Sequence, residues 1–406
     1  MPNVVFVAPF LMPATVRFVE ATARVPGVRL GLLTQDPAAK IPAQLAPRLA
    51  AHHRVEDAFD PRQLAAAARE LGGRLGGLDR LMGALEQLQV PLAEAREILG
   101  LPGMKAEAAR SFRDKARMKT VLRQAGVPCA RHRLAATRAE AREFAGQVGF
   151  PLVVKPPAGA GAAATFRVDG PEALEQALSA AAPAAGQEVL LEEFVVGEES
   201  SFETVSIDGR SVWTSSTRYL PTPLEALRHP WIQWCVLLPR EREEPRLADV
   251  REVAHRALAA LGMGTGLSHM EWFRRRDGSI AISEVAARPP GAQITTLVSV
   301  AHEWDFLAAW ARLMVHNEFE APPRKWAAGA AFFRGMGQGR VKAVHGLAEA
   351  QREVGALVVE AKLPRPGQPK SSSYEGEGYA VLRHESTEVV AKALLRLVSM
   401  VRVEYE

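Results

Sequence analysis

The clearest structural signal in this sequence is the run Gly266-Leu-Ser-His-Met-Glu-Trp-Phe-Arg-Arg-Arg-Asp-Gly-Ser-Ile-Ala-Ile-Ser-Glu-Val-Ala-Ala-Arg288. Two segments with alternating side chains flank an Asp-Gly pair, a pattern typical of an antiparallel β-hairpin. If Asp277 and Gly278 form the turn, the register of the hairpin places Glu271 directly opposite Glu284.

This pairing brings two carboxylates together on one face of the hairpin. Like charges that lie opposite each other destabilise an antiparallel pair unless a cation lies between them. Oxygen ligands favour magnesium, which commonly takes one or two protein carboxylates and completes its shell with water and substrate phosphates. Phe273 and Ile282 are expected on the same face as Glu271 and Glu284, which argues against full solvation. The hairpin by itself leaves open the alternative that both glutamates face solvent.

Two cationic side chains are candidates for phosphate binding. Arg288 follows the second strand and precedes Pro289-Pro290-Gly291, a rigid turn that could hold a guanidinium near a phosphate. Lys155 ends an apolar strand and precedes a loop of small residues whose backbone amides could approach a phosphate closely. The loop lacks the GxxxxGK[ST] pattern of a P-loop, so a tight hairpin is its alternative. For Arg288 the alternative is a structural role.

Composition narrows the class of protein. The 406 residues suggest roughly two to three domains. Lys and Arg number 50 and are mixed with 46 Asp and Glu, so a nucleic-acid partner is not expected. The first apolar stretch is broken by Pro9 and Pro13, which argues against a signal peptide, a membrane span or a membrane partner. Cys129 and Cys235 are too few for a disulfide framework, so we expect a cytoplasmic protein.

The chain changes character along its length. Near the N-terminus, Val4–Ala8, Ala14–Arg24 and Val28–Thr34 follow a βαβ pattern, which predicts an open parallel sheet. No GxGxxG follows the first strand, so a dinucleotide site is not supported. A helix is expected over Lys105–Gln124, close to a domain boundary. Strands then become denser up to about Asn317 and predict an α+β region.

An aromatic segment offers a place for a second substrate. Residues 213–234 hold three Trp and one Tyr, together with the cationic Arg218 and with His229. Such a segment could form an apolar wall, which would include Trp231, with a cationic end that binds a carboxylate. An ordinary sheet core with a loop explains the same pattern, and the sequence does not decide between the two.

An ordered set of motifs resembles the ATP-grasp superfamily. These motifs are, in chain order, Arg113–Lys119, Ala125–Pro128, Gly149–Pro156, the small-residue loop, Leu190–Glu203 and the glutamate hairpin. Within the superfamily the chain resembles the carboxylate-amine ligases, that is, L-amino acid ligases and the modules of carbamoyl phosphate synthetase and biotin carboxylase.

The resemblance implies an α/β and α+β architecture in which an N-terminal open parallel sheet precedes a two-lobed ATP-grasp fold. The expected boundaries are 1–103 for the N-terminal domain, 104–195 for the small lobe with a lid at 151–193, 196–325 for the large lobe, and 326–406 for a C-terminal subdomain that closes the large lobe.

The resemblance also implies roles for individual residues. The ATP site would contain Lys115, Lys155, Gly159, Gly161, Glu192, Glu193, Val195 and Glu199, with Glu199 at the ribose. Glu271 and Glu284 match the ligands of Mg²⁺ or Mn²⁺. Arg288, with Lys155, matches the cations that act on the transferring phosphoryl group. Glu203 lies in the same region, with a salt bridge on the strand face as the alternative.

Two positions depart from the family pattern. Many relatives carry an Asn where this chain has Ala286, and a serine is common where it has Ala162. The hairpin register places His269 opposite Ala286, which suggests the hypothesis that His269 supports the metal site in place of the missing amide.

The implied activity is an ATP-dependent ligation of a carboxylate and an amine through an acyl phosphate, with release of ADP and phosphate. Amino acids are the expected small-molecule substrates, and a homodimer is compatible with the resemblance. A carboxylase that uses carboxyphosphate and a nucleotide-binding protein without turnover are the alternatives.

Overall fold

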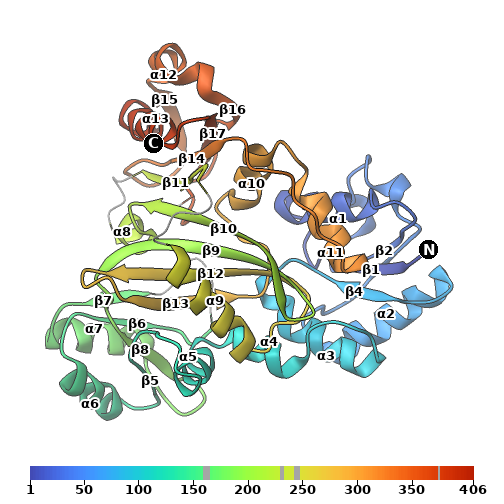
Figure 1. Ribbon diagram of the computed structural model, residues 1–406, viewed down its shortest axis with the longest axis horizontal. Coiled ribbons are helices and arrows are strands. Elements are labelled where there is room, and N and C mark those ends of the chain that lie inside the picture. The colour runs from blue at the N-terminus through green and yellow to red at the C-terminus, as the bar shows by residue number, and fades with distance from the viewer. Residues whose placement is uncertain (159–164, 229–232, 242–246, 374) are drawn as a thin grey trace.

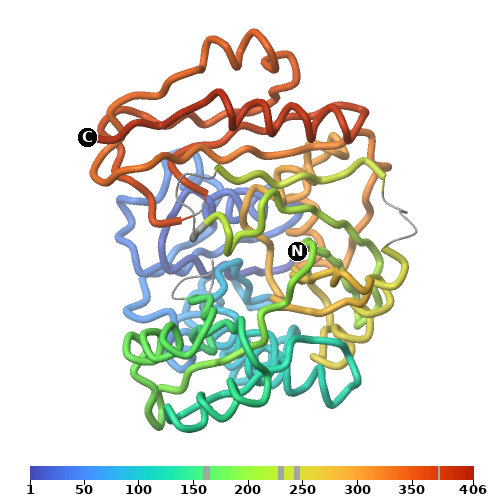
Figure 2. The backbone as a smooth tube through the Cα atoms, turned by 90° about the vertical axis from the view of Figure 1, so that its left-hand side faces the viewer, coloured from blue at the N-terminus to red at the C-terminus, as the bar shows by residue number. Residues whose placement is uncertain are grey.

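The computed structural model describes residues 1–158, 165–228, 233–241, 247–373 and 375–406. These residues form four sheets, and the middle of the molecule is one long antiparallel sheet (Figure 1). Figure 2 shows the C-terminal segment at one end of the molecule and the small lobe at the other. No helix of the described residues is long and apolar enough to cross a membrane.

The N-terminal part forms the expected open parallel sheet. Its strands are β1 (Asn3–Val7), β2 (Arg29–Thr34), β3 (Ala51–Arg54) and β4 (Arg80–Met82), in the order β3-β2-β1-β4. The helices of this part are α1 (Pro13–Ala23), α2 (Pro61–Leu75) and α3 (Gln89–Leu99), with short 3₁₀ turns at Ala38–Lys40, Ala46–Arg48 and Glu86–Leu88. Residues 4–7 of β1 are fully buried, as befits a strand covered on both faces.

The helix expected over Lys105–Gln124 is broken at one residue. The structure has α4 (Ala106–Arg113) and α5 (Lys115–Gln124), separated by Asp114 in an extended conformation. The Asp114 side chain accepts a hydrogen bond from the amide of Arg117 and so caps α5, which is why an aspartate starts a new helix here. The break places Lys115 at the first position of α5, where its amide donates to the carbonyl of Pro157 at 2.9 Å.

The small lobe is a four-stranded antiparallel sheet covered by two helices. Its strands are β5 (His132–Ala135), β6 (Leu152–Lys155), β7 (Phe166–Val168) and β8 (Val189–Glu193), in the order β5-β8-β6-β7. Its helices are α6 (Arg138–Val148) and α7 (Pro171–Ala181). Phe144 of α6 and Leu178 of α7 share one apolar core with Leu152 and Leu191.

The large sheet has eight strands and continues into the C-terminal segment. In spatial order these are β13 (Ile280–Ala286), β12 (Gly266–Arg275), β9 (Gly197–Ile207), β10 (Arg210–Leu220), β11 (Trp234–Leu238), β14 (Ala327–Phe333), β17 (Gly378–His384) and β16 (Val358–Lys362). The segment expected as a C-terminal subdomain, 326–406, therefore adds three strands to this sheet.

Helices pack against both faces of the large sheet. They are α8 (Pro223–Arg228), α9 (Ala248–Ala260), α10 (Ile294–His302), α11 (Phe306–His316), α12 (Leu347–Val354) and α13 (Thr387–Met400), with a 3₁₀ turn at Gly355–Leu357. Strands β15 (Val341–His345) and β18 (Arg402–Tyr405) pair separately. One apolar core joins Phe6 of β1, Trp310 of α11 and Trp234 of β11, so the N-terminal domain and the large lobe share their interior.

The glutamate hairpin forms β12 and β13, and its turn differs from the expected one. Arg275 pairs with Ser279 through an amide-to-carbonyl hydrogen bond of 2.8 Å, so the loop has three residues rather than two. Gly278 ends this loop in the left-handed region at φ 83°. A bulge at Ser283 then inserts one unpaired residue into β13, and Glu271 faces Glu284. The longer loop shifts the register by one residue, and the bulge at Ser283 shifts it back by one. Glu271 and Glu284 therefore pair as predicted.

The bulge corrects one expectation from the sequence. Because the register changes at Ser283, Trp272 pairs with Ile282, and Ile282 packs in the core beneath the hairpin with Met270. Only Phe273 lies on the side of the two glutamates, where it lines a cavity.

Candidate active site

A cavity of about 690 Å³ opens between the small lobe, the large sheet and the N-terminal domain. This volume is within the range of small-molecule sites. The predicted site residues that line it are Lys115, Lys155, Glu192, Glu193, Val195, Glu199, His269, Glu271, Glu284 and Arg288. Segments far apart in the sequence therefore meet around one space.

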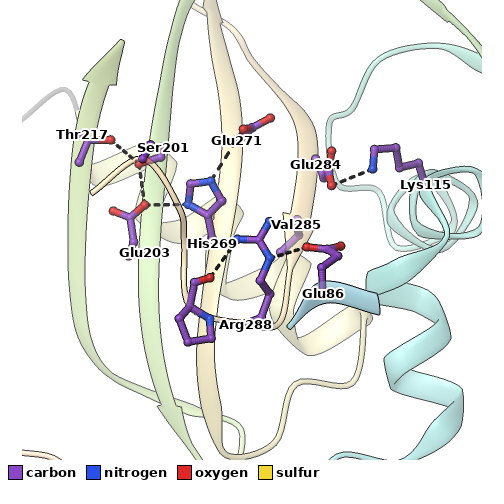
Figure 3. Close-up of polar contacts among 12 residues, drawn as sticks. Glu86, Lys115, Ser201, Glu203, Thr217, His269, Glu271, Glu284, Val285 and Arg288 are labelled. Carbon is purple, nitrogen blue, oxygen red and sulfur yellow. Dashed lines mark hydrogen bonds and ion pairs between the residues drawn. The ribbon is translucent and has the colours of Figure 1, made fainter. Parts of the chain in front are cut away.

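The glutamate pair lies in the wall of this cavity. Glu284 forms an ion pair with Lys115, whose Nζ lies 2.8 Å from Oε1 (Figure 3). Burial would raise the pKa of Glu284, but attraction by Lys115 and Lys155 outweighs it and lowers the pKa below its usual value. For Glu199, burial and the nearby Glu271 raise the pKa well above the usual value. The cavity thus holds an ionised carboxylate on β13 and an excess of acidic groups that favours cations.

Lys155 and Lys119 share one buried carboxylate. Glu192 Oε1 lies 3.0 Å from the Nζ of Lys155 and 3.4 Å from that of Lys119. Burial would lower the pKa of Lys155, but attraction by Glu192 and Glu284 raises it above its usual value. Lys155 is therefore cationic at neutral pH and lies at the end of β6, where a phosphate could reach it.

The Glu193–Val195 segment connects the small lobe to the large sheet. Both carboxylate oxygens of Glu193 are engaged, with Arg131 Nε at 2.7 Å and Arg275 Nη2 at 2.6 Å. Because both oxygens are held by arginines, the Glu193 side chain is not available to a ligand. This agrees with the expectation that backbone groups of this segment bind the base. Phe194 lines the cavity beside Val195, and the Arg167 guanidinium lies 4.3 Å from the centre of its ring.

His269 belongs to a chain of hydrogen bonds and ion pairs that ends at Glu271 (Figure 3). Its Nδ1 lies 2.9 Å from Glu203 Oε1, which also accepts a bond of 2.6 Å from the Ser201 hydroxyl. Its Nε2 lies 3.8 Å from Glu271 Oε1. Burial would lower the pKa of His269, but Glu203 and Glu271 raise it to about 9. With Nδ1 held by Glu203, the other ring nitrogen of His269 faces the carboxylate of Glu271.

Arg288 is held by the N-terminal domain. Its Nε donates to Glu86, which lies in the 3₁₀ turn after β4, and its Nη1 donates to the carbonyl of Pro289 at 2.9 Å (Figure 3). Arg113 lies on the other side of Glu86, with Nη1 3.8 Å from Oε1. Glu86 thus joins the arginine after the hairpin to the N-terminal domain.

Two of these residues, Glu86 and Lys119, were not predicted from the sequence. For Glu203 the structure shows the alternative that the sequence left open, an ion pair with His269 across neighbouring strands. Lys119 lies within the motif Arg113–Lys119, but only the fold shows that its ammonium is completely buried and points at the bulge, where it donates to the carbonyl of Ser283 at 2.5 Å. Glu86 carries no local signal, because its partner is 202 residues away.

The expected acceptor segment is divided between two faces of the sheet. Tyr219 of β10 and Trp234 of β11 line the cavity, whereas Arg218 lies in a small separate pocket with Glu241 and Arg324. Side chains alternate across a strand, so Arg218 points away from the face that carries Tyr219. Trp213 packs in the core against Phe306. The structure therefore does not bring Arg218 to the cavity.

Some predicted residues lie outside the described residues. They are Gly159, Gly161 and Ala162 of the small-residue loop, and His229 and Trp231 of the acceptor segment.

The pair Glu271 and Glu284 fits a divalent metal of the hard type. Among the described residues no group of three or more His, Cys, Asp or Glu side chains is arranged to hold a metal. Mg²⁺ is nevertheless commonly bound by only one or two protein carboxylates, and phosphates and water supply its other ligands. The two carboxylates lie beside Lys115 and Lys155, an arrangement compatible with a metal that binds together with a nucleotide. The same oxygen ligands also accept Mn²⁺.

Comparison with protein families identifies the domain that forms most of this cavity. The model of the ATP-grasp domain matches residues 120–302, which run from α5 through the hairpin to α10. Over these residues the chain matches an ATP-grasp domain. This match includes Lys155, Glu271, Glu284 and Arg288, so the ATP-grasp domain supplies most of the cavity wall. Lys115 and Glu86 are contributed from outside it.

Known proteins that are similar to this chain include amino acid ligases. An L-arginine-specific L-amino acid ligase of Bacillus subtilis is 25% identical over 231 residues, which cover 55% of this chain and 55% of that protein. The chain thus spans about half the length of the curated relatives it matches first.

Solved structures extend the likeness of fold to the whole chain. The crystal structure of an L-amino acid ligase from Bacillus licheniformis superposes with a TM-score of 0.81 at 21% identity, covering 100% of this chain and 99% of that one. An N5-carboxyaminoimidazole ribonucleotide synthetase from Thermotoga maritima gives a TM-score of 0.68 at 18% identity, with complete coverage of both chains. The expectation of a parallel N-terminal sheet followed by an ATP-grasp fold is confirmed.

Proposed function

We propose that this protein is an ATP-dependent carboxylate-amine ligase that forms an amide or peptide bond and releases ADP and phosphate. The observation that carries the proposal is the opposed pair Glu271 and Glu284, which lines one cavity together with Lys155 and Arg288. The relatives with L-amino acid ligase activity support amino acids as substrates.

In the proposed reaction an oxygen of the substrate carboxylate attacks the γ-phosphorus of ATP, and ADP leaves. The nitrogen of a neutral amine then attacks the carbonyl carbon of the acyl phosphate, phosphate leaves, and the nitrogen loses a proton. No nucleophile from the protein is required. The chain's task is to hold the reactants in line and to stabilise the charge of the transferring group.

Each cation of the site has a proposed part in this task. Lys155 and Lys115 bind phosphate oxygens of ATP, and Lys115 leaves its ion pair with Glu284 when a metal takes that carboxylate. Arg288 binds the phosphoryl group as it passes to the carboxylate, where its planar guanidinium suits two oxygens at once. Mg²⁺, held by Glu271 and Glu284, would supply further neutralisation of phosphate charge when bound.

The adenine end is proposed to lie along Phe194 and Val195, with Glu199 nearer the ribose. Glu193 would hold the segment through Arg131 and Arg275 rather than contact the base. We also place the protein in the cytoplasm, where ATP is abundant and free thiols such as Cys129 and Cys235 remain reduced.

The experiment that tests the proposal measures ADP and phosphate release with Mg-ATP and pooled amino acids, other carboxylates or bicarbonate. We expect release that depends on a carboxylate pool together with an amine. Glu271→Gln should lower kcat by about 100-fold or more, since a carboxylate ligand is lost. Glu172→Gln, which changes an exposed glutamate of α7, is the control and should keep full activity.

Two results would redirect the proposal. Release that requires bicarbonate instead of another carboxylate would indicate carboxyphosphate chemistry. Tight ATP binding without release in any pool would indicate a nucleotide-binding protein without turnover, in line with the departure from the family pattern at Ala286.

A further inference from the structure

The cavity continues beyond Arg288 into an apolar region that the nucleotide does not explain. In the large sheet, β10 lies two strands and β11 three strands from β12, the strand of Glu271. At about 4.8 Å between neighbouring strands, this region begins about 10 Å from the metal side. Its walls include Tyr219, Trp234 and Ile294, with Phe18 of α1 on the N-terminal side.

The aromatic wall is rigid. The rings of Tyr219 and Trp234 lie 5.5 Å apart, and Trp234 stacks on Phe332 at 5.1 Å. The indole nitrogen of Trp234 donates to the carbonyl of Pro221 at 2.9 Å, so its polar atom is already satisfied. A surface of this kind offers apolar contact and no further hydrogen bond from the indole.

Glu375 adds a carboxylate to the lining of the cavity, apart from the exposed Glu225 of α8. Glu375 belongs to the connection between β16 and β17, and its Oε1 accepts a hydrogen bond of 3.3 Å from the amide of Ala292. Ala292 follows Arg288 by four residues, so the carboxylate is tied to the same loop as that arginine. Burial raises the pKa of Glu375 above its usual value, and the amide of Ala292 opposes this only in part.

Glu375 differs from four other glutamates of the cavity, and it lies away from the metal side, where Glu199 and Glu271 lie close to Lys155. Glu86, Glu192, Glu193 and Glu284 each form an ion pair with Arg or Lys. For Glu375 the described residues provide no Lys, Arg or His within ion-pair distance. A half-buried carboxylate in an apolar pocket is costly unless a cation neutralises it, so this position suits a cationic ligand.

We propose that Glu375 binds the ammonium group of an α-amino acid whose carboxylate is activated at Arg288, and that Tyr219 and Trp234 receive an apolar side chain of that amino acid. This inference rests on the proposed ligase function and names its substrate class. In an α-amino acid the nitrogen lies about 2.5 Å from the carboxyl carbon, so one loop can bring groups of opposite charge to both ends of the substrate. Glu375 is then a specificity-determining residue that rejects carboxylic acids without an amine.

The test compares apolar amino acids with their analogues that lack the amine, in wild-type protein and in Glu375→Gln. We expect Glu375→Gln to raise the KM for the amino acid by about tenfold to a hundredfold, the loss typical of a charge-assisted hydrogen bond. The KM for ATP should stay the same, and the already low kcat/KM for the analogue should not fall further. Glu375→Asp should recover part of the loss. Glu385→Gln, an exposed glutamate beyond β17, is the control.

An unchanged KM in Glu375→Gln, or an equal loss for amino acid and analogue, would overturn the inference. If wild-type protein releases ADP with no carboxylate, the proposed function fails instead. Calorimetric binding of the amino acid in the presence of a non-hydrolysable ATP analogue then tests Glu375 separately. Equal affinities of wild type and Glu375→Gln would reject its role, and weaker binding by the variant would support it.

Discussion

Lys119 shows how a single residue can support both the fold and the candidate site. Its ammonium is fully buried, lies 3.4 Å from Glu192 and donates to the carbonyl of Ser283. Burial lowers the pKa of Lys119, and Glu192 offsets this only in part. The lysine therefore gives the carbonyl of the bulge residue Ser283 a hydrogen-bond donor and so stabilises the bulge that brings Glu284 into position.

We expect Lys119→Met to lower the free energy of unfolding by about 3 kcal/mol, since removing one member of a buried ion pair leaves the other uncompensated. The KM for ATP should rise as well, because Glu192 would then attract Lys155 more strongly. Urea unfolding and steady-state kinetics measure the two effects. Lys392→Met, which removes an exposed lysine of α13, should change neither, and a Lys119→Met protein of unchanged stability would contradict this role.

At the scale of single residues, the sequence predicted the members of the site better than their partners. Glu271, Glu284, Lys155 and Arg288 lie in motifs with strong local patterns, and all four line the cavity. Partners such as Glu86 could not be predicted, because an ion pair between distant segments depends on how the domains pack.

At the scale of elements, the hairpin β12–β13 depends on its turn and its bulge. Gly278 adopts φ 83°, and a Cβ at this position would meet no atom within 4 Å. The cost of a side chain here is therefore one of backbone conformation alone. The Asp-Gly pair predicted a hairpin correctly, but neither the three-residue loop nor the bulge at Ser283 has a distinct signal in the sequence.

Gly278→Ala should lower the free energy of unfolding by about 1 kcal/mol, the cost of placing an L-residue in the left-handed region. The matched control is Gly146→Ala in the last turn of α6, where the glycine has ordinary helical geometry and no close neighbour. This control should raise the free energy of unfolding by up to about 1 kcal/mol. Thermal unfolding of both variants checks the prediction, which fails if the two changes have the same sign.

At the scale of the whole molecule, the N-terminal domain takes part in the site through Glu86. The side chain is nearly buried between Arg288 and Arg113, so its charge is balanced by two guanidinium groups. Arg288 also has a raised pKa, because the attraction of Glu86 outweighs the effect of burial. Glu86 is a positioning residue that acts through Arg288.

Glu86→Gln should lower kcat by about tenfold with little change in the KM for ATP, since the guanidinium loses the charged partner that orients it. Glu86→Asp should restore part of the kcat. The control is Glu94→Gln, which removes the N-terminal domain's member of a more exposed ion pair, between Glu94 of α3 and Arg110 of α4. An equal fall in kcat for both variants, or a rise in the KM for ATP alone, would contradict the positioning role.

The shared core of the N-terminal domain and the large lobe has a consequence for the exchange of parts between related enzymes. Phe18 of α1 lies 5.0 Å from Trp310 of α11, edge to face, and Phe6 of β1 contacts the same indole. An exchange of residues 1–103 alone would therefore set Phe6 and Phe18 against a tryptophan of the other parent, although α11 is more than 200 residues away in the chain. The exchanged part must be chosen by the packing of the interior rather than by the order of the gene.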